Sequence, residues 1–139
     1  MFSADLARVA LIRKLQPEWQ RHKLNGIGGK IEASDSSEQV AMVREFREET
    51  GVVTTCAQWR RFLFMAGAND DATEFALDCF VTTGDLSALR TQEAETIEIL
   101  PVSALHVGRP DTLDNVVWLV GLARDHLQDG RPRFADVCY

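Results

Sequence analysis

Three carboxylates in the first half of the chain have the spacing that puts side chains on one side of a helix. Glu45, Glu48 and Glu49 stand three and four positions apart, and residues at these separations share a helix face. Like charges gathered in this way repel one another and weaken a helix. A hard cation such as Mg²⁺ binds a few carboxylates together with phosphate and water oxygens. The spacing is compatible with a metal site, although a solvated acidic helix face is the ordinary interpretation of such spacing taken alone.

The residues before and after these acids fit the same interpretation. Gly28 and Gly29 allow the backbone to approach a ligand closely. The helix is expected to begin near Ser36 or Ser37, because Ser36 followed three residues later by Gln39 makes a capping box. It is expected to end just before Gly51, which suits the left-handed residue that follows a helix. A glycine loop, a helix and clustered acids together could hold a metal–pyrophosphate.

The stretch from Gly28 to Val52 resembles the Nudix box, G-x5-E-x7-R-E-U-x-E-E-x-G-U, in which U is a bulky aliphatic residue. Two departures lie in the middle of the box. Asp35 stands where the family has glutamate, and eight residues instead of seven separate it from the arginine. Because the catalytic half is intact, we interpret the extra residue as a loop variation. The matching positions are Gly29, Arg44, Glu45, Phe46 in place of the aliphatic residue, Glu48, Glu49, Gly51 and Val52.

The resemblance implies a Nudix hydrolase of the α/β (α+β) class, with a mixed sheet sandwiched between helices. It implies that Glu48 and Glu49 bind Mg²⁺, or Mn²⁺ in its place, and that Glu45 joins them or acts as the base that activates water. It also implies that a backbone carbonyl at Gly29 or Lys30 reaches the metal.

Further acidic and basic residues are assigned with the same resemblance in mind. Arg44 is expected to orient a glutamate and not to touch phosphate. Nudix enzymes often add one acid from a loop before a late strand, and Glu93, Glu95 and Glu98 lie in that region. Glu95 is the preferred ligand, with Glu93 next. Each of these acids taken alone could also be a solvated charge.

Candidates for substrate contact lie outside the box. Asn115 stands near the start of the last expected helix, where antimutator triphosphatases of the family carry an asparagine that reads the purine edge. Trp19 either packs its loop onto the body or lines the substrate cleft, and Phe80 either belongs to the core or stacks on a base. If Asn115 is a surface or capping residue, base recognition falls to Trp19, Phe62, Asp78 or Phe80.

Composition limits the class of protein. The chain has 139 residues, of which 45% are hydrophobic and 26% charged, as expected for one soluble domain spanning 1–139. Its net charge of −6 disfavours binding to a nucleic acid backbone. Cys56, Cys79 and Cys138 form no CxxC pair and are interpreted as reduced thiols. With no membrane-spanning or signal pattern, we expect a cytoplasmic monomer or homodimer.

Hydrophobic alternation and helical spacing predict the other elements. A hairpin is expected to cross a polar turn at 69–72. A second helix is expected over 111–127, with Asp111 or Thr112 as its cap and Gly130 after its end. The expected strands are 7–15, 24–32 as a strand or extended turn, part of 52–65, 74–83, 96–102 and 133–139.

The main hypothesis is Mg²⁺-dependent hydrolysis of a nucleoside diphosphate linked to another group. The markers of NADH, ADP-ribose and dinucleoside polyphosphate enzymes are missing, so a nucleoside triphosphate pyrophosphohydrolase of the antimutator type remains by default. Two alternatives stay open. The inserted residue slightly favours a non-catalytic module that senses a nucleotide, and an acidic helix without any ligand is the other.

Overall fold

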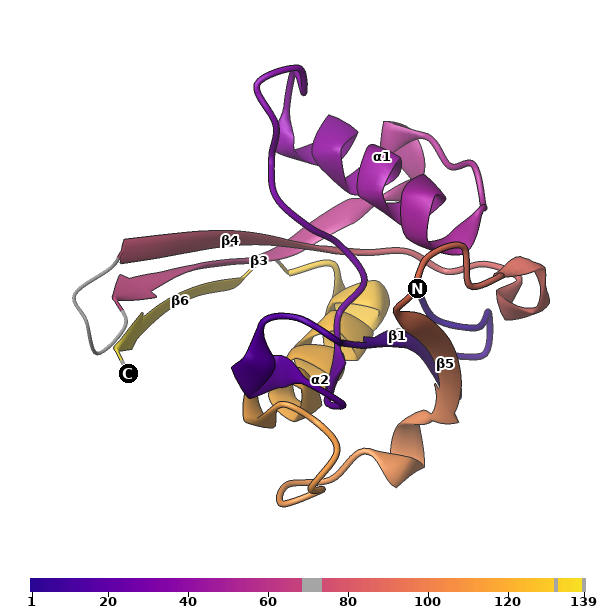
Figure 1. Ribbon diagram of the computed structural model, residues 1–139, viewed down its shortest axis with the longest axis vertical. Helices are drawn as coiled ribbons and strands as arrows, with labels where there is room; N and C mark the ends of the chain where they lie inside the picture. Colours follow the sequence, from indigo (N-terminus) through magenta and orange to yellow (C-terminus); the bar gives the residue numbers. More distant parts are fainter. Residues whose placement is uncertain (69–73, 132, 139) are drawn as a thin grey trace.

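The strands divide between two three-stranded sheets, and the two long helices pack on either side of them (Figure 1). The computed structural model describes residues 1–68, 74–131 and 133–138. The polar turn expected at 69–72 and the final Tyr139 lie outside these residues. The elements are β1 Arg8–Arg13, β2 Leu24–Asn25, α1 Glu38–Thr50, β3 Arg60–Ala68, β4 Glu74–Val81, β5 Thr96–Pro101, α2 Asp114–Asp129 and β6 Arg133–Cys138, with 3-10 turns at Glu18–Gln20, Cys56–Gln58, Leu86–Ala88 and Val102–Ala104.

One sheet is antiparallel and the other is mixed. The first has the order β2-β1-β5, with both neighbours antiparallel to β1. The second has the order β4-β3-β6, in which β3 and β4 form the expected antiparallel hairpin and β6 runs parallel to β3. The expected mixed α+β fold is therefore confirmed.

Strand β1 lies between two hydrophobic cores, so residues on both of its faces are buried. Val9 and Leu11 pack in a cluster that includes Val120 of α2. Ala10 packs in a second cluster with Phe46 of α1. Alternate residues of a strand point to opposite faces, and here each face meets a different helix. The near-continuous apolar run of β1 follows from this position.

Helix α1 has the boundaries that its sequence predicts, but the capping box expected of Ser36 and Gln39 does not form, because the Gln39 side chain donates to the Trp59 carbonyl. Ser37 is the N-cap, and its side chain accepts a hydrogen bond from the Val40 N–H at 3.3 Å. Gly51 follows the helix with φ of 73°, and its N–H donates to the Arg47 carbonyl. Phe46 is fully buried and meets the Trp59 ring edge-on, with ring centroids 4.9 Å apart. Both ends and the middle of the helix are thus anchored.

Helix α2 begins later than expected, and the predicted cap at Asp111 or Thr112 is wrong. Leu113 occupies the N-cap position and makes no side-chain cap. The Asp111 carboxylate instead accepts hydrogen bonds from Arg109 at 2.6 Å and from Arg13 at 3.1 Å. These ion pairs hold the carboxylate away from the helix end. Gly130 follows the helix with φ of 70°, as predicted.

Two predicted strands are shorter than expected. The extended stretch 24–32 contains only the two-residue β2, because the glycines after it turn toward α1. The stretch 52–65 contributes strand only from Arg60 onward. Thr55 and Gln58 form a capping box on the turn at Cys56–Gln58, which delays the strand.

Two further features concern the cysteines and the lengths of the helices. Cys56 and Cys79 are free thiols, and the Cys138 side chain lies outside the described part. Within that part, no helix has the length and apolar character needed to cross a membrane.

Replacing Phe46 by alanine is expected to lower the free energy of unfolding by about 3–5 kcal/mol, the range for a buried phenylalanine. The ring is fully buried and has an aromatic partner. Urea unfolding measures the change. Val53→Ala is the control, since Val53 is 75% exposed and its truncation leaves no cavity. Equal losses in the two variants would contradict the role given to Phe46.

Candidate active site

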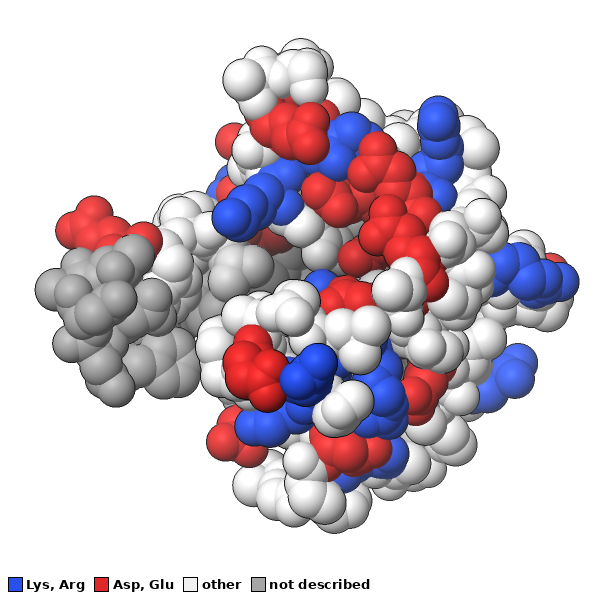
Figure 2. Space-filling model, viewed as in Figure 1, with Lys and Arg blue, Asp and Glu red and all other residues white. Residues whose placement is uncertain are grey.

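A cavity of about 610 Å³ lies beside the glycine loop and α1. Its walls come from the loop 25–31, from one face of α1, from β4 and from α2. Of the three box carboxylates, Glu45 is the one that lines it. Figure 2 shows acidic side chains gathered over α1 beside a hollow in this face of the molecule. The acidic face of α1 thus borders a space large enough for a nucleotide.

The two box glycines bring the backbone against the acids of α1. Gly28 has φ of +144°, a conformation that side chains disfavour, and its N–H donates to Glu49 Oε2 at 3.0 Å. A Cβ atom on Gly29 would lie 2.5 Å from the Glu45 carboxylate. Only glycine fits at this second position without displacing Glu45. The glycine loop and the acids therefore form one unit.

Arg44 connects the acids to one another. Its Nη1 donates to Glu45 Oε1 and to Glu48 Oε2, each at 3.0 Å. Its Nη2 donates to the Lys30 carbonyl at 3.0 Å. The guanidinium thereby offsets the repulsion between two neighbouring carboxylates and ties them to the glycine loop. These contacts place Arg44 beside both glutamates, and its role in orienting them for the reaction stays a prediction.

Asp35 holds Arg44 from the other side. It accepts hydrogen bonds from Arg44 Nε at 3.1 Å and from Nη2 at 2.9 Å, a bidentate pair. The Asp35 side chain is only 3% exposed, and the guanidinium lowers the pKa of this carboxyl. The extra loop residue is thus compatible with a shorter acid that reaches the arginine. The contact between Asp35 and Arg44 was not predicted, although the position of Asp35 where the family has glutamate was a signal for it.

Glu49 is the buried member of the acidic face. It is 8% exposed, and burial raises the pKa of its carboxyl to about 7, while Lys14 and the Gly28 N–H act in the opposite direction. The neighbouring charges of Glu45 and Glu95 raise the pKa further. The ionised form of Glu49 is therefore only partly compensated by the groups around it.

Glu95 lies near this cluster, but both of its carboxylate oxygens already have partners. Glu95 pairs with Lys14 at 2.5 Å and accepts hydrogen bonds from the backbone N–H groups of Leu15 at 2.7 Å and Gln16 at 3.2 Å. These contacts fix it to the end of β1. The other late acids lie differently, since Glu98 pairs with Arg13 and Glu93 is exposed.

The donor set fits an open metal site and not a closed cage. Among the described residues, no three acid, histidine or cysteine side chains are arranged to hold a metal. Glu45 and Glu48 share Arg44, and Glu49 turns to Gly28. Mg²⁺ commonly uses one or two carboxylates and completes its shell with water and substrate phosphates. The hard oxygen ligands on this face suit that mode of binding.

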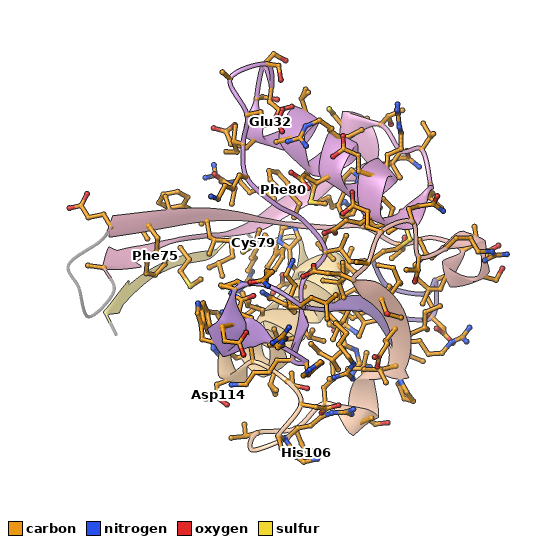
Figure 3. All side chains as sticks on the ribbon, viewed as in Figure 1. Glu32, Phe75, Cys79, Phe80, His106 and Asp114 are labelled. Atoms are coloured by element: carbon orange, nitrogen blue, oxygen red, sulfur yellow. The ribbon has the colours of Figure 1, made fainter. Side chains whose placement is uncertain are left out.

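Of the three predicted substrate residues Phe80, Trp19 and Asn115, Phe80 is the one that lines the cavity. Phe80 lines it and packs in the cluster below α1 (Figure 3). Trp19 is 67% exposed and is not among the residues that line the cavity. Asn115 is half-buried in the first turn of α2, where its neighbours Val116 and Leu119 reach the lining in its place. The contact roles of these three residues stay predictions.

Comparison with known proteins identifies a family. The model of the NUDIX domain matches residues 3–118, which includes the whole glycine loop, α1 and β1 to β5. A search of the curated proteins finds no match. Among solved structures, the chain is similar to one from a structural and functional study of MutT from the psychrophile fish pathogen Aliivibrio salmonicida and the mesophile Vibrio cholerae. The TM-score is 0.63 at 23% identity, over 86% of this chain and 90% of that one.

Asp35→Asn is expected to destabilise the fold at neutral pH and much less in acid. The folded pKa of Asp35 is depressed, so its ion pair stabilises the protein above the unfolded pKa of about 4 and is lost as the pH falls through the lower folded value. Unfolding of parent and variant should be compared at pH 7 and pH 3.

The matched control for Asp35 is Glu32→Gln. Glu32 lies 3.9 Å from the same guanidinium but its side chain is 61% exposed, so its neutralisation should change little. A stability difference between the parent and Asp35→Asn that is the same at both pH values would contradict the assignment.

Proposed function

The chain belongs to the Nudix family, whose hydrolases act on pyrophosphate bonds, and we propose that it is a Mg²⁺-dependent nucleoside triphosphate pyrophosphohydrolase. Water would attack a phosphorus of the triphosphate, and a nucleoside monophosphate and pyrophosphate would leave. The observation that carries this proposal is the place of Glu45. It lies on the cavity wall against Gly29 and is held there by Arg44.

The roles of the acids follow from their surroundings. Glu48 is 46% exposed at its side chain and Glu49 is buried with a raised pKa, so these two carboxylates would hold the cation between them and the substrate. Glu45 lines the cavity and would take the proton of the attacking water. Arg44 keeps Glu45 and Glu48 in position through both of its Nη1 contacts.

Bound Mg²⁺ would polarise a phosphoryl oxygen and make a coordinated water more acidic. The chain itself carries a net charge of −6, so a triphosphate needs cations to approach the acidic face. Lys30, which lines the cavity beside the box glycines, supplies one of them. Farther from the acids, the cavity wall is mainly apolar and suits a sugar and base.

Glu48→Gln is expected to lower turnover by about 100-fold or more, the scale of losing a catalytic or ligating group. The assay is pyrophosphate release from a panel of nucleoside triphosphates with Mg²⁺. Asp125→Asn is the control, because it removes the same charge from an exposed position on α2. Near-parent turnover by Glu48→Gln would remove the central assignment, and a parent inactive on every triphosphate would refute the substrate class.

Glu49→Gln tests the metal without any activity measurement. In the metal-free parent, the folded pKa of about 7 exceeds the ordinary value of 4.5, so the carboxyl lowers stability as the pH rises through that interval. Glutamine has no such penalty. At pH 8, Mg²⁺ is expected to raise the melting temperature of the parent clearly and that of the variant much less.

The control for this experiment is an equal ionic strength of KCl, which should act alike on both proteins. An identical response of the parent and Glu49→Gln to Mg²⁺ would show that Glu49 is not a ligand.

A further inference from the structure

Asp78 brings a carboxylate to the wall of the cavity outside the box. It lies on β4, opposite Phe64 of β3, and its side chain is only 14% exposed. It lines the same cavity as Glu45. Its neighbours in that lining from β4 and α2 are mainly apolar, among them Phe80, Val116 and Leu119. A buried carboxylate in such a wall is costly without a partner.

Arg61 is the ion-pair partner of this carboxylate. Its guanidinium pairs with Asp78 Oδ1 and lies over the Phe64 ring, 5.2 Å from the centroid. Arg61 is not among the described residues that line the cavity, and its side chain is 49% exposed. It therefore approaches from outside the lining, while Asp78 borders the cavity. A carboxylate has about four lone-pair sites, so one ion pair leaves acceptor capacity for a ligand.

We propose that Asp78 reads the nucleobase and selects bases that present two adjacent N–H donors. Guanine does this with its N1–H and its 2-amino group. Adenine places acceptor nitrogens beside its single amino group, and uracil flanks its N–H with two carbonyls, so both would set acceptors against the carboxylate. This inference rests on the proposed function, because it takes the nucleotide to lie in this cavity with its phosphates at Glu45.

A purely structural ion pair is the competing explanation for Asp78. In that case the pair only ties β4 to β3, and either half would matter equally. Two variants separate the explanations, because Asp78→Asn and Arg61→Gln break the same pair. Only the first removes the carboxylate from the cavity wall.

The experiment is equilibrium binding of GMP, IMP and AMP with Mg²⁺ by calorimetry, which needs no turnover. The parent is expected to bind GMP about 10-fold or more tighter than AMP, the scale of a bidentate base contact. IMP keeps the N1–H but lacks the amino group, so it should bind with intermediate affinity. This series in the parent tests the two-donor contact even where a variant fails to fold.

The variants are expected to differ in the ratio of GMP to AMP affinity. Asp78→Asn should bring it close to one, while Arg61→Gln should keep most of it, with melting temperatures measured for each. Equal affinities in the parent, equal binding of IMP and GMP, or a ratio lost as fully in Arg61→Gln as in Asp78→Asn would each overturn the inference.

Failure of the proposed function gives a different result. A parent that binds GMP selectively but releases no pyrophosphate from any triphosphate would refute the hydrolytic substrate class and leave the role of Asp78 standing. A parent that hydrolyses triphosphates without base preference would refute the role of Asp78 and leave the hydrolytic substrate class standing.

Discussion

The acidic site depends on the hydrogen bonds that the Arg44 guanidinium donates to Glu45 and Glu48. Glu45 and Glu48 lie on one helix face, where their charges repel. Arg44 donates to both and is itself held by the nearly buried Asp35. Its bond to the Lys30 carbonyl adds the glycine loop to the same network. A planar group with five donors can join these partners at once, whereas a lysine could not reproduce the paired geometry.

This network is useful only because α1 is fixed in rotation and length. Phe46, which lies between Glu45 and Glu48 in the sequence, is fully buried in the core and fixes the rotation of the helix. The caps at Ser37 and Gly51 set its two ends. A helix rotated by one residue would turn the carboxylates by about 100° and remove Glu45 from the cavity. The core of the fold and the geometry of the site are therefore controlled by the same few residues.

Local features of this fold were readable from the sequence, and long-range ones were not. Both ends of α1 follow from serine and glycine chemistry that acts within a few residues. The cap expected at Asp111 failed because Arg13, far away in the chain, pairs with that carboxylate. Glu95 pairs with Lys14 and accepts a hydrogen bond from the Leu15 N–H, contacts that the sequence did not indicate, and its role as a metal ligand stays a prediction. Pairings between distant segments carry no local signature, so periodicity alone could not predict them.

The balance of charge explains how an acidic site can exist before any ligand binds. Arg44 partly neutralises Glu45 and Glu48, and Lys14 acts on Glu49 and pairs with Glu95. These cations stabilise the acidic site but leave Glu49 with a pKa of about 7, which means that its ionised form is under-compensated there. A divalent ion that arrives with a substrate phosphate would supply the missing positive charge. The protein thus keeps the acids in position while leaving the charge of Glu49 only partly compensated.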